Sequence, residues 1–130
     1  MKKLVREIPL ANGLSVRFYD TSHRYFGDYH KVRVEICCEV PVVPELFQDQ
    51  TEYQQALKLI GPSARYLRHE EHQGVATADV ERVVQGIVEH FAGHSLRYFA
   101  GEEFPGRLVR SELERLKKRS TSFAGRHSHV

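Results

Sequence analysis

The sequence predicts a small α+β domain: an antiparallel sheet of three to four strands, opened by an N-terminal β-meander, with two to three helices packed on one face. Residues 31–40, KVRVEICCEV, alternate apolar and polar side chains over ten positions. A period of two is typical of a strand with one buried and one solvated face, the usual pattern of antiparallel sheets. After residue 50 the apolar spacing becomes helical.

The first strand is expected over residues 3–10, at an edge of the sheet, because Pro9 cannot donate a ladder hydrogen bond. Leu4, Ile8 and Leu10 are expected on one face of this strand, which Arg6 interrupts. The pair Asn12-Gly13 then predicts a hairpin, since these residues readily supply the two positive φ angles of a type I′ turn.

The second strand is expected over residues 14–19 and the third over residues 31–40, which Pro41 and Pro44 end. Residues 20–30 between them are predicted to form a loop. The core-facing side chains of these two strands are expected to be Leu14, Val16, Phe18, Val32, Val34, Ile36, Cys38 and Val40.

The first helix is expected to begin at a capping box, Thr51–Gln54, in which the Thr hydroxyl and the Gln amide bond reciprocal backbone donors. It ends before Gly61 and Pro62, which commonly terminate helices. Its contribution to the core is Leu57 and Ile60. Residues 64–73 fit two interpretations, a fourth strand or a short helix that ends at Gly74.

The second helix is expected to begin at the N-cap Thr77 and to end before Gly93, a natural C′ residue. Its buried stripe consists of Val80, Val83, Val84, Ile87, Val88 and Phe91. The third helix begins near Pro105 and has one basic face. Residues 120–130 lack periodicity and are expected to be a mobile tail, so that residues 1–119 form a single domain.

Length and composition set the outer bounds. The 130 residues fit one domain with a sizeable core, and 41% hydrophobic with 28% charged residues is ordinary for a globular protein. No apolar run approaches the roughly 20 residues that span a bilayer, so no membrane partner is expected. The two cysteines, Cys37 and Cys38, are adjacent and make no disulfide framework, which indicates free thiols in a reducing cytoplasm.

The net charge of +2 is unevenly spread. Residues 104–130 hold seven Lys and Arg against two Glu, a local charge of +5, whereas residues 1–103 carry −3. A basic C-terminal segment is a candidate for binding nucleic acid, an acidic partner or a second copy. The residues that would neutralise phosphates are Arg107, Arg110, Arg115, Lys117, Lys118 and Arg119. No aromatic side chain is interleaved among them, which favours a solvated helix face.

The predicted loop at residues 20–30 is the most unusual segment. Its ligand-binding candidates are His23, Arg24, Tyr25, Asp28 and His30. A carboxylate that orients an imidazole suits proton transfer, and an arginine beside aromatic rings suits a phosphate and a stacked base. The plainer interpretation, which we favour, is that the aromatic residues fold back as a lid over the end of the sheet and that Gly27-Asp28 is a turn.

Eight histidines make a metal site a hypothesis to test. The candidate ligands are His69, His72, His90 and His94. The last two have the i, i+4 spacing that places two ligands on one helix face. The counter-argument is that Gly93 ends the helix and turns the last histidine away from the one before it.

The adjacent cysteines do not favour thiol chemistry. Cys37 is expected on the solvated face between Glu35 and Glu39, where carboxylates disfavour the thiolate, and Cys38 is expected in the core. No catalytic triad, P-loop, G-x-G-x-x-G or paired-carboxylate motif is present. These observations favour a protein that is not an enzyme and has no cofactor.

We therefore expect a non-catalytic binding or regulatory module that forms homo-oligomers or binds a protein partner. An edge strand and a basic helix are available for such pairing. Two alternatives stay open: association with nucleic acid through the basic C-terminal helix, and a metal-binding protein or enzyme that uses the histidines.

Overall fold

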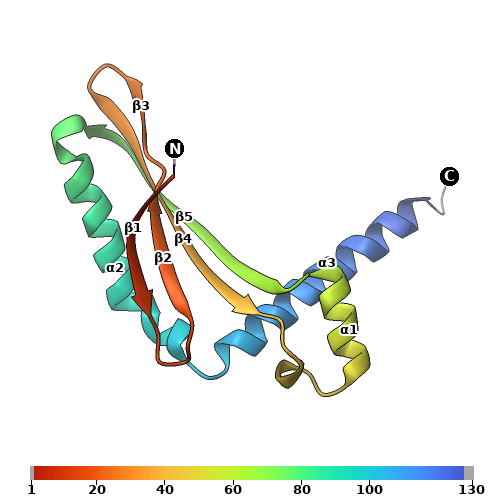
Figure 1. The fold of residues 1–130 in the computed structure, drawn as a ribbon. Coiled ribbons are helices and arrows are strands. Elements are labelled where there is room, and N and C mark those ends of the chain that lie inside the picture. The colour runs from red at the N-terminus through yellow and green to blue at the C-terminus, as the bar shows by residue number, and fades with distance from the viewer. Residues whose placement is uncertain (1, 128–130) are drawn as a thin grey trace. The chain divides into compact units, whose positions relative to one another are not determined.

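The computed structural model describes residues 2–127, and side chains as far as residue 119. It confirms the predicted α+β class, with an antiparallel sheet of five strands, an N-terminal meander and three α-helices (Figure 1). None of the helices in the described part of the chain is long and apolar enough to cross a membrane.

The chain divides into two compact units. The first consists of Met1–Cys38 and Tyr66–Gly101, and the second consists of Glu39–Arg65 and Glu102–Val130. That residues 1–119 form a single folding domain stays a prediction.

The sheet extends the predicted meander by two strands. The five strands are β1 Lys3–Pro9, β2 Ser15–Asp20, β3 His23–Phe26, β4 Tyr29–Pro41 and β5 Ser63–Ala76. Their order is β1-β2-β4-β3, and β5 also pairs with β4. β2 and β3 follow one another along β4, and at their junction the Thr21 N–H donates to the Arg33 carbonyl at 2.9 Å. Residues 64–73 therefore belong to a strand and not to a short helix.

β1 pairs only with β2 among the described strands, at the edge that the sequence predicts, but its apolar side chains do not share one face as predicted. A bulge between Leu4 and Arg6 shifts the pairing with β2. Leu4 stands opposite the outward-facing Tyr19, whereas Ile8 stands opposite the buried Val16. The side chains of Leu4 and Ile8 consequently point to opposite faces of the sheet. The prediction that Leu4 and Ile8 share one face is therefore wrong, and the Leu4 side chain is half exposed.

Helix α2, Val80–Ala100, covers the inner face of the sheet in the first unit (Figure 1). A 3₁₀ turn at Thr77–Asp79 precedes it, so the prediction of Thr77 as the N-cap is wrong. The Thr77 N–H donates instead to the Asp28 carbonyl at 3.0 Å, which ties the start of the helix to the sheet.

The same helix continues through Gly93, where the sequence predicts its end. The reason is packing beyond that residue. Phe99 is buried in the last turn, and its ring contacts Phe91 and Tyr66, with centroids 5.5 and 4.8 Å away. Burial of a phenylalanine contributes about 1.5–3 kcal/mol, which exceeds the cost of about 1 kcal/mol for a glycine inside a helix.

The turn between β1 and β2 also differs from the prediction. Gly13 has φ +87°, but none of the described non-glycine residues has a positive φ, so Asn12 does not form a type I′ turn. The Gly13 N–H donates to the Leu10 carbonyl at 3.1 Å, which makes a three-residue loop closed by glycine. The Asn12 amide instead donates to the carbonyls of Phe99 (2.8 Å) and Gly101 (3.3 Å) at the end of α2.

The core of the first unit lies between the inner face of the sheet and α2. Phe18 is fully buried and meets Phe91 edge-on, with ring centroids 5.7 Å apart. The predicted core residues that are buried, in either unit, are Val16, Phe18, Val32, Val34, Ile36, Cys38, Val40, Val84, Ile87, Val88 and Phe91. Those that are only partly buried are Leu14, Leu57, Ile60, Val80 and Val83.

The elements of the second unit, besides short ends of β4 and β5, are a 3₁₀ turn at Pro44–Leu46 and the helices α1, Gln50–Leu59, and α3, Phe104–His127. The two helices contact one another. α1 is capped by Asp49, whose carboxylate accepts a hydrogen bond from the Glu52 N–H at 2.7 Å. The predicted capping box at Thr51 is therefore wrong, because Asp49 is the N-cap and Thr51 already lies inside the first turn of the helix.

The C-terminal part of the chain is described as far as His127. The backbone of residues 120–127 continues α3, so the predicted boundary after residue 119 falls inside a helix. Residues 128–130 of the predicted tail lie outside the described residues, and the mobility of the tail stays a prediction.

Candidate functional site

The segment predicted as a loop, residues 20–30, is mostly strand. β3 and the start of β4 form a hairpin with its turn at Gly27-Asp28, and Gly27 has φ +52°. This confirms the predicted turn. The Asp28 carbonyl also accepts the Thr77 hydroxyl at 3.3 Å, and that hydroxyl lies 3.5 Å from Nδ1 of His30.

The aromatic residues of this hairpin do not fold back as a lid. Tyr25, Phe26 and Tyr29 are 52%, 73% and 49% exposed. Six large hydrophobic side chains are exposed in the described part of the chain, and these three, all within residues 25–29, are half of them. The lid interpretation is wrong because the two strands of the hairpin stay paired as far as Phe26 and Tyr29, across a bulge between Arg24 and Phe26, and the rings are exposed to solvent.

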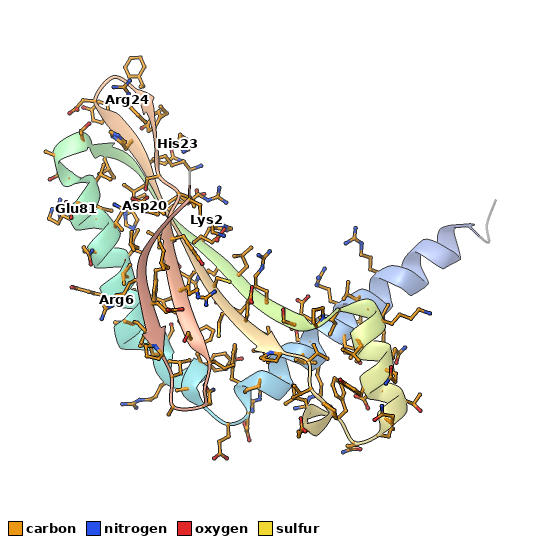
Figure 2. All side chains as sticks on the ribbon, viewed as in Figure 1. Lys2, Arg6, Asp20, His23, Arg24 and Glu81 are labelled. Carbon is orange, nitrogen blue, oxygen red and sulfur yellow. The ribbon has the colours of Figure 1, made fainter. Side chains whose placement is uncertain are left out.

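The residues predicted to bind a ligand do not converge on one site. His23 pairs with Lys31 on the outer face of the hairpin, whereas Arg24 pairs with His30 on the inner face. Figure 2 shows Arg24 on the hairpin, away from the start of β1 where Lys2 lies. The predicted set therefore lies on a hairpin where His23, Arg24, Tyr25 and Asp28 are exposed and His30 is partly buried, and binding of a ligand there stays a prediction.

A cavity of about 530 Å³ lies at the start of α2. Its charged side chains have both signs: Lys3, Asp20 and Glu81. Figure 2 shows Asp20 and Glu81 near one another at this end of the helix. The Asp20 carboxylate already accepts the Ser22 N–H at 2.9 Å. Of the predicted ligand-binding residues, His30 is the one that lines this cavity.

The four histidines proposed as metal ligands do not come together, because the sheet separates His69 from the other three. His69 and His72 are three residues apart on β5, and because a strand alternates its side chains they point to opposite faces. His72 lines a groove together with His90 and His94. Within the described residues, no group of three or more His, Cys, Asp or Glu side chains is arranged to hold a metal ion.

His90 and His94 share one face of α2, which corrects the expectation that Gly93 separates them. Their rings stack with centroids 4.2 Å apart. Nδ1 of His94 donates to the His90 carbonyl at 2.8 Å, one turn earlier in the same helix. The pair therefore forms one wall of the groove.

This groove between β5 and α2 has a volume of about 700 Å³. Its apolar floor consists of Val83, Ile87 and Phe91, which repeat every four residues along α2. From β5 it receives the alternating residues Arg68, Glu70 and His72, and from α2 it receives Arg82, Gly86, His90, His94 and Ser95. The Arg68 guanidinium contacts Glu70 Oε1 at 2.5 Å, and Arg82 lies 3.5 Å from Asp79.

The outer face of the sheet carries paired charges. Lys2 Nζ lies 2.6 Å from Glu35 Oε2, and His69 Nε2 lies 3.3 Å from Glu35 Oε1. The hydrogen bond from Lys2 is the main reason that the pKa of Glu35 is lowered, and the bond from His69 acts in the same direction. Glu71 is shared by Lys31 and Arg33 at 3.3 and 3.2 Å. This face is thus a network of ion pairs.

Cys37 lies on that outer face but is only 8% exposed, so the prediction that it faces solvent is wrong. Arg17 stands directly opposite it on β2, and long side chains on neighbouring strands cover a small residue between them. Strand periodicity reports the face of a residue and not the size of its neighbours. Cys38 is buried in the core, as predicted.

The basic face of α3 is partly neutralised within its own unit. Arg107 pairs with Glu103 at 2.7 Å, and Arg115 pairs with Glu112 at 2.8 Å. The other candidates for phosphate binding are Arg110, Lys117, Lys118 and Arg119. A nucleic-acid interface on this helix stays a prediction.

The groove is the feature that sequence reasoning missed. Its β5 residues belong to residues 64–73, the segment with two open interpretations, and only a strand brings Arg68, Glu70 and His72 to one face. In the sequence, Arg82 lies outside the predicted apolar stripe of the second helix, and nothing in its spacing indicates a groove. Comparisons with family models, with curated proteins and with solved structures gave no match for this chain.

Proposed function

We propose that the protein is a non-catalytic binding module whose ligand site is the groove between β5 and α2. The observation that supports this proposal is an apolar floor bordered by polar side chains that converge from two elements. Concave, largely apolar pockets with a few convergent polar groups are the usual form of small-molecule sites. The groove volume of about 700 Å³ lies within the roughly 300–1,000 Å³ that such sites occupy.

The walls of the groove belong to rigid parts of the first unit. Ile87 and Phe91 are buried in the core, and Phe91 contacts Phe18 on β2. Sites built on packed helices and strands hold their geometry better than sites on loops. The non-catalytic part of the proposal comes from the sequence, which lacks a nucleophile and base at a motif spacing. A cytoplasmic location is likewise proposed, from the two adjacent thiols.

A substitution that fills the groove tests the proposal. Gly86 lines the groove, and no atom lies within 4 Å of the position that a Cβ would take there. The leucine of Gly86→Leu should therefore occupy the space above the floor without a clash. The probe is N-phenyl-1-naphthylamine, a neutral aromatic molecule that fluoresces more strongly in apolar surroundings.

The expected result is saturable binding of this probe to the wild-type protein and loss of binding in Gly86→Leu. Gly93→Leu is the matched control, because Gly93 also lies in α2 with open space around it but does not line the groove. Equal binding by both variants would overturn the proposal, and so would a wild-type protein that does not bind the probe. Circular dichroism checks that each variant is folded.

A second candidate function is self-association through the hairpin of β3 and β4. The observation that favours it is the exposure of Tyr25, Phe26 and Tyr29 beside Arg24. Tyrosine and arginine are among the residues that dominate the energy of protein interfaces. The bulge in β1 and its Pro9 disfavour strand addition at that edge of the sheet. The proposed association uses the side chains of the hairpin.

Sedimentation velocity over a range of protein concentrations tests this candidate. Wild-type protein should form a dimer that Phe26→Ser dissociates. Leu67→Ser should leave the dimer intact, because Leu67 is also an exposed apolar residue, 41% exposed, but lies on β5 outside the hairpin. A monomeric wild-type protein, or equal dissociation by both variants, would refute self-association through the hairpin.

A further inference from the structure

We infer that the ligand of the groove is a small amphipathic anion, with an apolar body on the floor and an acidic group held by Arg68 and Arg82. This inference rests on the proposed function and names the ligand class. It depends on three properties of the groove: the charge of its rim, the open space beside Gly86 and the shape of its floor.

The rim carries more positive than negative charge. Arg68 and Arg82 line the groove from β5 and α2, whereas Glu70 is the one carboxylate among the lining residues. Asp79, the ion-pair partner of Arg82, is not a lining residue. Exposed ion pairs contribute little net stability, and a guanidinium has five donors, so both arginines retain donors for a ligand. An anionic group is therefore the complementary ligand for this rim.

His90 and His94 contribute contact surface to the groove, in contrast to the two arginines, which contribute charge. Nδ1 of His94 is engaged by the His90 carbonyl, and the two rings are stacked. Their aromatic faces and edges extend the wall above Phe91, on which a flat or aliphatic ligand can pack. The charge that selects an anion is thus placed on the arginines, and the histidines add contact area.

Gly86 explains why the floor is accessible. A glycine in a helix interior is less stable than alanine, and it is often retained where another group must approach the backbone closely. In this structure no protein atom makes that approach at Gly86, and the open space beside it is part of the groove. The missing side chain leaves open space beside Ile87, the next residue, and beside Val83, about one turn earlier along α2.

The floor and the volume limit the size of the ligand. Val83, Ile87 and Phe91 form one stripe about two turns of helix long, which suits an aromatic ring system or a short alkyl chain. A free inorganic phosphate would leave this stripe unused, and a neutral hydrocarbon would leave both guanidinium groups unused. A carboxylate, sulfonate or phosphate monoester with an apolar body uses both.

Two matched probes test the inference. 1-Anilinonaphthalene-8-sulfonate has the aromatic body of N-phenyl-1-naphthylamine with an added sulfonate. The sulfonate probe should bind wild-type protein more tightly than the neutral one. The double variant Arg68→Gln, Arg82→Gln should weaken binding of the sulfonate probe about tenfold or more, the effect of losing a hydrogen bond to a charged group, and leave the neutral probe unaffected. Arg97→Gln is the control, because Arg97 is an exposed arginine of α2 outside the groove.

Displacement of the bound sulfonate probe then separates the acidic groups. Octanoate and octyl phosphate should both displace it, whereas octanol should not, and the tighter of the two anions identifies the preferred acidic group. Equal displacement by octanol would overturn the inference, as would a double variant that binds the sulfonate probe like wild type. If Gly86→Leu abolishes binding of both probes while the arginine substitutions change neither, the groove remains the ligand site and only the anionic ligand class is refuted.

Discussion

Replacing Asn12 by aspartate tests the tie between the first hairpin and the end of α2. The Asn12 amide donates to the Phe99 carbonyl at 2.8 Å and to the Gly101 carbonyl at 3.3 Å, while its oxygen accepts from the Leu14 N–H at 3.2 Å. Aspartate keeps the shape and the bond to Leu14 but replaces the two donor bonds with repulsion between a carboxylate and two carbonyl oxygens.

The expected loss in the free energy of unfolding is about 2 kcal/mol. A hydrogen bond contributes about 1 kcal/mol net, and the longer bond to Gly101 is expected to contribute less. A negative charge at a helix C-terminus costs about 0.3–1 kcal/mol more. Urea unfolding followed by circular dichroism measures the sum. High salt should recover part of the loss in Asn12→Asp but none in Asn12→Ala, which has no charge to screen. A stability within about 0.5 kcal/mol of wild type would refute this role of the side chain.

A buried ring, two glycines and one carboxylate provide the remaining predictions. Phe18→Ala should lower the free energy of unfolding in urea by about 3–5 kcal/mol, because the ring is fully buried; a loss below about 1 kcal/mol would contradict that packing. In thermal unfolding Gly13→Ala should destabilise by about 1 kcal/mol, since Gly13 has φ +87°, whereas Gly86→Ala should stabilise by about 0.5–1 kcal/mol; shifts of the same sign would be inconsistent with these backbone conformations. Glu35, whose folded pKa is lowered chiefly by Lys2, contributes stability that is present above the ordinary glutamate pKa of about 4.3 and is lost as the pH falls through the folded value. Glu35→Gln should therefore be less stable than wild type at neutral pH and approach it as the pH falls through the lowered pKa of Glu35, and a difference that is independent of pH would argue against the ion pair.

Strand periodicity was the most dependable signal in this sequence. The alternation in residues 31–40 places Val32, Val34 and Ile36 in the core, and all three are fully buried. The alternation is clear in the sequence because these side chains all lie on the face of the sheet that α2 covers, where an apolar residue is required at every second position. A bulge breaks the same rule in β1, where the polar and apolar positions alternate too weakly to reveal that Leu4 and Ile8 lie on opposite faces.

The ends of elements depended on residues far away in the sequence. Gly93 has the local signature of a helix end, but the contacts of Phe99 with Phe91 and Tyr66 carry α2 another seven residues. Asn12 has the local signature of a type I′ turn, but its amide binds carbonyl groups almost 90 residues later. Neither contact can be inferred from a short window of sequence.

Candidate sites were harder to predict than the fold, because a site depends on which faces meet. The spacing of His69 and His72 was compatible with a pair of metal ligands as long as residues 64–73 could be either a helix or a strand. These residues form a strand, and the two side chains point to opposite faces. The groove arises from two neighbouring elements, and each of them separately looks like an ordinary amphipathic segment.

The adjacent thiols in β4 make a built-in reporter of how the sheet opens. Cys37 and Cys38 are the two cysteines of the chain; they point to opposite faces and are 8% and 1% exposed. Alkylation with iodoacetamide, followed by mass spectrometry, would count the adducts as each face becomes accessible. A population carrying a single adduct would reveal that one face of the sheet is uncovered before the other, whereas a direct passage from none to two would show that both faces open in one event.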